Sequence, residues 1–276
     1  MDTFSSGCPE GRRVSAHIEA TVVDRSTQVL AIAVAVADGY SCEESLSVTL
    51  DGAPVVVEEV PTTQGGRLHV ARDVPVGALV VDYVAAVRGE AAAPTVDDEQ
   101  WLRYLRPSRY CESDRIGAFA REEFGGLSAG ELVAAVPDWV ERRVRYVPGA
   151  SRPTDGAIAT LMAGEGVCRD FVHLTAALLR ANDVAARAVA VYAPGLYPMD
   201  FHAVVEVLVD ARWVVIDPTG LAPRQSLVRI ATGADAADTA FLTTVGGRVD
   251  LTGIEVTAVA DPDLPFDDRS RLEVLR

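Results

Sequence analysis

The sequence predicts an α+β protein, in which an N-terminal β-sandwich-like domain is followed by a domain that combines helices with an antiparallel sheet. Three observations predict this class. Short, valine-rich segments fill the first third of the chain, helical periodicity begins after about residue 100, and strand-like segments return after a strongly apolar helix. We expect the first domain to span residues 1–95 and the second 101–276, with a core at 105–245 and C-terminal strands at 246–276.

The N-terminal region contains short segments with almost no helical periodicity. They are rich in Val and often alternate apolar and polar residues, which is typical of half-buried strands. Turn pairs such as Asp38-Gly39 and Asp51-Gly52 separate them, and a linker at 91–98 follows. The predicted strands, which favour a small sandwich or sheet, are Val14–Val23, Gln28–Ala37, Glu44–Leu50, Ala53–Val60, Arg67–Val70 and Ala78–Val87.

Helical patterns begin after the linker. Ser128 and Glu131 form a capping-box pattern before an apolar stripe, and Pro137 is expected to kink that helix or delay its start. The helix that begins at Cys168 has almost no polar face, so we expect it to be buried. The predicted helices are Ser113–Phe124, the one after Ser128, Asp155–Ala163 and Cys168–Ala181, and the predicted strands are Ala186–Tyr192, His202–Val209 and Trp213–Asp217, with weaker strands beyond Gly246.

Cys168, His202 and Asp217 follow one another in the order of a nucleophile, a base and an orienting carboxylate. Cys168 stands at a helix start, where free N–H groups and the helix dipole favour a thiolate. A two-residue turn at Asp210-Ala211 puts His202 and Asp217 on one face of a hairpin, roughly 7 Å apart, whereas a register shifted by one residue separates them. The Cys168 N–H is a candidate oxyanion donor, and the sequence identifies no second donor.

Each of these residues also has a simpler structural interpretation. A cysteine at a helix start is more often buried structure, a histidine on a strand more often packs or faces solvent, and Asp-Pro is first of all a strand terminator. Asp170 is expected to order the turn at Cys168, and Trp213 is a core residue more often than a groove wall. His173 points about 140° away from Cys168 around a helix and is interpreted as packing. The residues alone leave the catalytic and the structural interpretations open.

Composition excludes several classes of function. A formal net charge of −15 disfavours a nucleic-acid partner, and all 25 basic residues are Arg, so the chain offers no Lys amine. The start of the chain lacks the features of a leader, and no apolar run approaches the ~20 residues that span a bilayer, so we expect no membrane attachment and a cytoplasmic location. The four cysteines are Cys8, Cys42, Cys111 and Cys168. Their spacing matches neither a disulfide framework nor a metal site, so we expect no metal and no cofactor.

Three sequence blocks carry a resemblance to a known family. Gly-Val-Cys-Arg-Asp at 166–170, His-Ala-Val-Val-Glu-Val at 202–207 and Trp-Val-Val-Ile-Asp-Pro-Thr at 213–219 resemble the transglutaminase-like cysteine enzymes of bacteria, a superfamily with a papain-type catalytic plan. The resemblance covers roughly residues 101–245, and the N-terminal region is more weakly similar to the β domain that often precedes this core. The chain departs from the family at Val204, where an aromatic residue, usually Trp, is common.

The resemblance implies that Cys168 is the nucleophile, His202 the base and Asp217 the orienting residue, with Asp170, Val204 and Trp213 supporting the site. It implies a thioester formed at an amide, either a glutamine side chain or a peptide bond of a protein substrate, whose acyl group passes to a small amine or to water. Val204 keeps open the alternative of a catalytically silent module that binds peptide. An enzyme that depends on NTP, metal or calcium is disfavoured, because no phosphate loop or ligand cluster is present.

Overall fold

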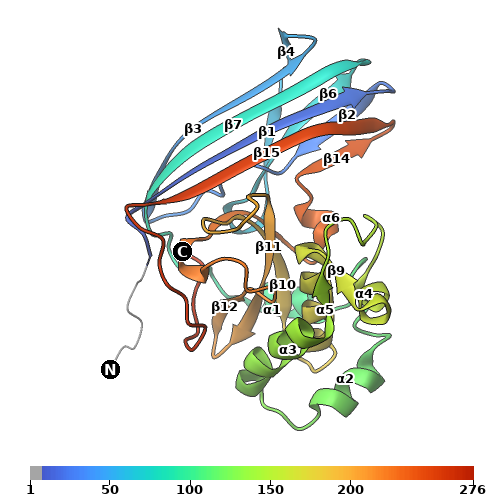
Figure 1. Cartoon of the computed structure of the whole chain (residues 1–276), viewed down its shortest axis with the longest axis vertical. Coiled ribbons are helices and arrows are strands. Elements are labelled where there is room, and N and C mark those ends of the chain that lie inside the picture. Colours follow the sequence, from blue (N-terminus) through green and yellow to red (C-terminus); the bar gives the residue numbers. More distant parts are fainter. Residues whose placement is uncertain (1–7) are drawn as a thin grey trace.

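The structure, a computed structural model, describes residues 8–276. The prediction that the first residues do not form a leader concerns mainly residues 1–7, which lie outside the described residues. Figure 1 shows two parts stacked along the long axis. The upper part is a β-sandwich, and the lower part is a sheet covered by helices, which we call the α+β core. Within residues 8–276 no helix combines the length and the apolar content needed to cross a membrane.

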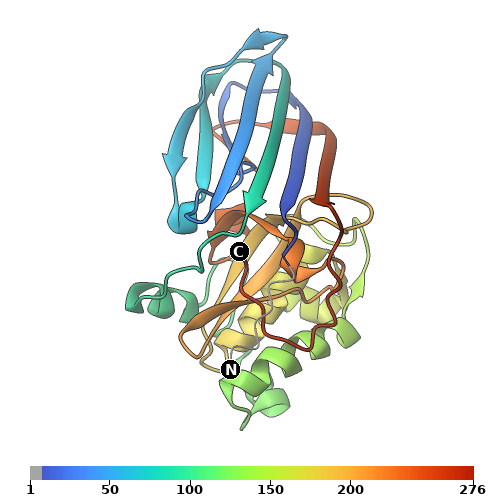
Figure 2. The same ribbon diagram turned by 90° about the vertical axis from the view of Figure 1, so that its left-hand side faces the viewer.

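Two antiparallel sheets form the β-sandwich, with strand orders β15-β1-β7-β3-β4 and β14-β2-β6-β5. Every second side chain of β1 is buried, as the period of a strand requires, and apolar residues from both sheets form one core. Figure 2 shows the two sheets packed face to face. The strands are β1 (Gly11–Val22), β2 (Ser26–Leu30), β3 (Tyr40–Leu50), β4 (Ala53–Pro54), β5 (Glu58–Pro61), β6 (Arg67–Val74), β7 (Gly77–Gly89), β14 (Leu242–Val245) and β15 (Val249–Asp261).

One predicted strand, Gln28–Ala37, is shorter in the structure. β2 ends at Leu30, and residues 31–35 continue as a buried segment without a strand ladder. The Ala31 N–H donates to Phe241 O at 3.0 Å, and the Ala35 N–H donates to Arg229 O at 2.9 Å. A continuous apolar run predicts burial, but it does not show which groups the backbone N–H and C=O bond to. The sequence therefore could not show that the strand ends at Leu30.

The C-terminal strands differ from the predicted division of the chain. β15 pairs with β1 from Gly11 opposite Asp261 to Val22 opposite Val249, and β14 pairs with β2, so both belong to the β-sandwich. The division predicted from the sequence assigns residues 246–276 to the second domain. Alternation predicts that a strand exists, but the sheet edge that it joins is set by long-range pairing, which alternation does not encode.

After β15 the chain returns to the α+β core. The Val215 N–H donates to Glu273 O at 2.7 Å, and Leu275 is buried in an apolar cluster with Val204 and Val215. The Arg224 guanidinium is paired with Asp267 at 2.7 Å. The last residues therefore pack along the outer strand of the α+β sheet.

The α+β core contains an antiparallel sheet in the order β12-β11-β10-β13 and a short parallel pair, β8-β9. Helix α5 is buried almost throughout and packs with α3 on one face of the sheet. The elements are α1 (Asp98–Leu105), α2 (Gly117–Phe124), α3 (Ala129–Arg143), β8 (Arg145–Tyr146), α4 (Ala157–Ala163), β9 (Glu165–Gly166), α5 (Cys168–Arg180), β10 (Ala186–Tyr192), β11 (His202–Val209), β12 (Arg212–Ile216), β13 (Val228–Gly233) and α6 (Ala236–Thr239).

The predicted helices α2 to α5 are present, and α1, α6 and β13 were not predicted. The capping box of Ser128 and Glu131 starts α3 at once, so Pro137 lies inside the helix and does not delay it. α1 begins at the end of the segment interpreted as a linker. Its cap is Asp97, whose side chain accepts from the Gln100 N–H at 2.8 Å.

The boundary between the two parts is buried and hydrogen-bonded. The Tyr192 hydroxyl on β10 donates to Ile32 O at 2.9 Å, and the Thr63 hydroxyl donates to Thr232 O at 3.3 Å. Tyr192, Val228 and Ile230 lie in the same apolar cluster as the sandwich core. The β-sandwich thus packs directly against the edge of the α+β sheet that β10 and β13 form.

Candidate active site

The start of α5 holds Cys168 in a defined place. Asp170 is fully buried, and one of its oxygens accepts from the Val167 N–H at 2.8 Å and from the Ser151 hydroxyl. An added Cβ at Gly166 would lie 2.7 Å from the Asp170 Cβ, so the close approach of these residues requires glycine. Asp170 therefore orders the first turn, as predicted, while Cys168 stays partly exposed.

The hairpin of β11 and β12 has the predicted register. Asp210 and Ala211 both have positive φ, 48° and 57°, the conformation of a type I′ turn, and Val209 pairs with Arg212. His202 and Asp217 consequently share a face, and His202 Nε2 lies 3.0 Å from Asp217 Oδ2. The predicted contact between imidazole and carboxylate is present.

The other oxygen of Asp217 is held by Thr219, which the sequence analysis did not single out. Asp217 Oδ1 accepts from the Thr219 N–H at 2.9 Å and from its hydroxyl at 2.7 Å. The sequence could have indicated this contact, because an Asp two residues before a Thr often accepts a hydrogen bond from it in an Asx-type turn. The carboxylate is therefore fixed on both oxygens, with one oxygen facing His202.

The electrostatics of the site favour a charged imidazole. Burial lowers the pKa of His202, but the Asp217 carboxylate and the nearby Cys168 side chain together raise it to about 10. Burial raises the pKa of Asp217, but His202 and Thr219 lower it by more. His202 Nδ1 is buried without an oxygen or nitrogen partner among the described residues. Since Nε2 is held by Asp217, Nδ1 is the nitrogen available to Cys168.

Comparison with known proteins identifies the family. The model of the transglutaminase-like superfamily matches residues 119–218, which include Cys168, His202 and Asp217. A crystal structure of a candidate cysteine protease from Cytophaga hutchinsonii is 30% identical, with a TM-score of 0.85 and 95% of each chain covered. The chain belongs to the transglutaminase-like superfamily. Since that likeness extends over both parts, the β-sandwich is a shared component of the two proteins.

Two further relatives are more distant from this transglutaminase-like protein. An uncharacterised protein of Mycobacterium leprae is 26% identical over 74% of this chain and 85% of its own length. The periplasmic domain of TgpA from Pseudomonas aeruginosa, bound to ethylmercury, is 21% identical over 78% of this chain and 91% of its own, with a TM-score of 0.41. That score is too low to carry an argument about this chain.

Two predicted supporting residues of the transglutaminase-like protein are core residues. Val204 is fully buried with Val189 and Val215, so it fills the sheet face beside the site instead of lining an open groove. Trp213 is buried between the edge of Tyr104 and the Arg187 guanidinium, which lies 3.9 Å from the ring centroid. Trp213 is four residues from Asp217, roughly 13 Å along the strand, and the structure does not bring it to Cys168.

His173 has the packing role that its helical position predicted. Its ring stacks on Tyr110 with centroids 5.2 Å apart, and its Nε2 accepts from the Ala236 N–H at 3.2 Å. Burial is the largest influence on His173 and lowers its pKa to about 4. His173 is therefore neutral and already bonded, in contrast to His202.

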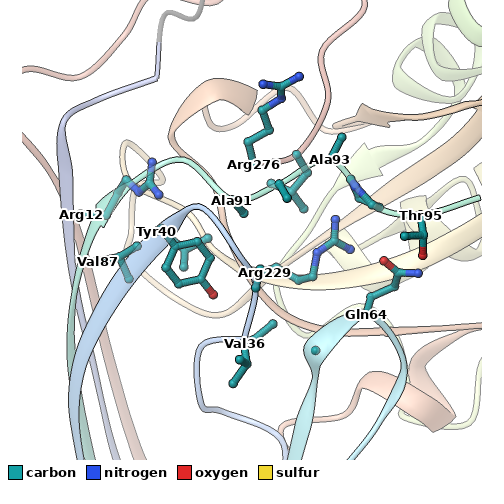
Figure 3. A pocket seen from close by; sticks show the side chains of 17 residues that line it. Arg12, Val36, Tyr40, Gln64, Val87, Ala91, Ala93, Thr95, Arg229 and Arg276 are labelled. Atoms are coloured by element: carbon teal, nitrogen blue, oxygen red, sulfur yellow. The ribbon is translucent and has the colours of Figure 1, made fainter.

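A cavity of about 210 Å³ lies at the boundary between the β-sandwich and the α+β core. Figure 3 shows its walls, to which Tyr40 and Gln64 come from the sandwich, Arg229 from β13 and Arg276 from the chain end. Its lining includes none of the residues around Cys168. No group of three or more His, Cys, Asp or Glu side chains within residues 8–276 is placed to hold a metal ion.

Proposed function

We propose that this protein is a cysteine acyltransferase or hydrolase that acts on the carbonyl carbon of an amide through a thioester on Cys168. The substrate is a protein or peptide, attacked at a glutamine side chain or a peptide bond, and the acceptor is a small amine or water. A protein or peptide is a better partner than nucleic acid for a chain with a net charge of −15. The cytoplasmic location stays a prediction.

The observation that carries this proposal is the orientation of His202. Its Nε2 is 3.0 Å from Asp217, which leaves Nδ1 as the ring nitrogen that can face Cys168, whose side chain is near enough to act on the imidazole. This is the arrangement of a nucleophile, a base and an orienting carboxylate. The candidate cysteine protease that shares the fold over 95% of both chains supports hydrolysis as one outcome.

The reaction has two halves. The Cys168 thiolate bonds to the carbonyl carbon, and the carbonyl electron pair moves to oxygen. When that oxyanion collapses, the C–N bond breaks and the His202 imidazolium gives its proton to the leaving amine, so that a thioester remains. In the second half His202 takes a proton from the acceptor, which attacks the thioester and releases Cys168.

Iodoacetamide labelling of individual cysteines tests the ion pair. Cys8 and Cys42 are internal controls, because burial raises the pKa of Cys8 and burial together with Glu44 raises that of Cys42 to about 11. Across about pH 5 to 9, a range that includes the pH at which an ordinary thiol ionises, we expect Cys168 to label fastest below about pH 7 and to lose that advantage in His202→Ala. Equal labelling of Cys168 and the two controls in the native protein would contradict the proposal.

Mass spectrometry of a glutamine-containing peptide with methylamine tests the acyl transfer. Transamidation and hydrolysis give products of different mass, and the chain cannot confuse the result by crosslinking itself through lysine, because it has none. Cys168→Ala should abolish both products without changing the melting temperature. A native protein that binds such a peptide but converts neither its side chain nor its backbone would instead favour the silent, peptide-binding module.

A further inference from the structure

Tyr146 is fixed beside the nucleophile by the short parallel pair of strands. On β8 it stands opposite Gly166 of β9, and the Val147 N–H donates to Gly166 O at 2.9 Å. The preceding residue is anchored too, because the Arg145 N–H donates to Gly164 O at 2.9 Å. Since Gly166 lies two residues before Cys168, this ladder sets Tyr146 against the start of α5.

The ring of Tyr146 is positioned so that its hydroxyl reaches Cys168. It lies 6.0 Å from the ring of Phe171, a buried residue of the first turn of α5. The strand pairing and this ring contact place the hydroxyl close enough to Cys168 for the backbone N–H and the thiol to influence its pKa. Tyr146 remains 42% exposed, so a substrate can approach it from solvent.

The Cys168 N–H has no partner within α5 and lies against the Tyr146 hydroxyl. The first N–H groups of a helix have no partner within the helix, and here Asp170 satisfies the one at Val167, just outside α5. The N–H of Cys168 belongs to the first helical residue and points toward the same side as the Tyr146 hydroxyl. Two donors therefore meet next to the sulfur atom.

We propose that the Tyr146 hydroxyl is the second oxyanion donor of this enzyme and acts together with the Cys168 backbone N–H. The inference rests on the proposed function. When Cys168 Sγ bonds to the carbonyl carbon, the electron pair of the C=O π bond moves to oxygen, and both donors direct hydrogen bonds to that oxygen. When the pair returns to carbon, the C–N bond breaks and His202 protonates the amine, so Tyr146 keeps its own proton throughout.

The surroundings keep Tyr146 a donor. Burial, the charge of Cys168 and the charge of Asp200 raise the pKa of Tyr146 to about 12. The phenol is thus protonated throughout the neutral range. A deprotonated phenol would repel an oxyanion.

Tyr146→Phe tests the inference, because it removes the hydroxyl and keeps the ring that packs on Phe171. The probe is p-nitrophenyl acetate, whose acetyl group Cys168 accepts through an oxyanion. We expect the rate constant for acylation to fall on the order of 10²-fold, with little change in KM. Tyr110→Phe, the same change on a tyrosine that stacks on α5 at His173, should acylate at the native rate.

Alkylation by iodoacetamide separates catalysis from structure, since attack on its methylene carbon forms no oxyanion. Cys168 of Tyr146→Phe should alkylate at the native rate and with the native pH dependence. Native acylation by Tyr146→Phe, or a parallel loss of alkylation and acylation, would overturn the role of Tyr146 alone. A native protein that cannot be acylated at all would overturn the proposed function, and this inference with it.

Discussion

Strand β11 carries two buried ionisable groups on one face, and the comparison between them shows how the proposed reactive group differs from a structural one. At its beginning His202 meets one carboxylate, that of Asp217, at 3.0 Å. Four residues further on, Glu206 meets two guanidinium groups. Its oxygens lie 2.7 Å from Arg187 and 2.6 Å from Arg229.

The two groups differ in whether a bonding position is left open. Burial raises the pKa of Glu206, but the two arginines lower it to about 2, so the carboxylate keeps its charge and both oxygens are bonded. Arg187 is also held, over the ring of Trp213 and by the Gln100 side chain. His202 keeps Nδ1 without an oxygen or nitrogen partner in the described part of the chain. A carboxylate with both oxygens bonded holds elements together, whereas a ring nitrogen without a partner can exchange a proton.

The largest expected effect breaks the pair of His202 and Asp217. Asp217→Asn keeps the shape of the side chain but cannot hold the imidazole in the charged state, so turnover should fall by on the order of 10²- to 10⁴-fold. Steady-state hydrolysis or transamidation measures it, with Asp210→Asn in the exposed turn as the control. Native turnover in Asp217→Asn would remove this carboxylate from the mechanism.

The next effect breaks the buried cluster of Glu206, Arg187 and Arg229. Glu206→Gln leaves Arg187 buried without its counter-charge, so the free energy of unfolding should fall by about 3–5 kcal/mol in urea titration. Glu58→Gln, which breaks an exposed pair with Arg72, should cost about 0–1 kcal/mol. Cys168 of folded Glu206→Gln should still label rapidly. A loss no larger than that of Glu58→Gln would mean that the buried cluster contributes no more than a surface pair.

The pH dependence sharpens the comparison. The pKa of His202 is raised, so the imidazolium that we propose protonates the leaving amine persists up to about pH 10 and is lost above it. Turnover should therefore decline on the alkaline side near that value. In Asp217→Asn the main cause of the raised His202 pKa is gone. The alkaline decline of the residual activity should therefore occur about 1–3 pH units lower than in the native protein. An alkaline limb at the same pH in both proteins would contradict this assignment.

The smallest expected effect tests whether the Thr219 hydroxyl holds the Asp217 carboxylate in place. Thr219→Val removes the hydroxyl that donates to Oδ1 at 2.7 Å and leaves the backbone N–H in place. The loss of one such bond is worth about 1 kcal/mol, so turnover should fall roughly 3- to 10-fold. The side chain has nearly the same volume, so the melting temperature should change little. A loss as large as that of Asp217→Asn would mean that Thr219 does more than hold the carboxylate.

The sequence predicted what depends on local chemistry. Alternation and a two-residue turn fix the register of β11 and β12, so the contact between His202 and Asp217 could be predicted from the residues of one hairpin. The capping pattern at Ser128 and the apolar helix after Cys168 were likewise local signals. These features need no knowledge of distant partners.

The features that were missed depend on pairings between distant residues. The residues Arg145-Tyr146 do not by themselves predict a strand. They form one because they pair with Glu165 and Gly166, 20 positions away. Alternation alone does not separate a groove residue from a core residue at Trp213, although the core was the favoured interpretation, and the contact with Arg187 places it in the core. The pairing of β15 with β1 joins residues near opposite ends of the chain, beyond any local pattern.

The pairing of β14 and β15 with β2 and β1 has a consequence for synthesis. Each sheet of the β-sandwich receives an edge strand from the end of the chain, so β1 and β2 keep open edges until residue 261 has left the ribosome. Open edges attract other strands, and pairings this distant form slowly. A chain that terminates before residue 242 would contain Cys168, His202 and Asp217 but display both edges. Such a truncated product would be prone to aggregate through those two edges.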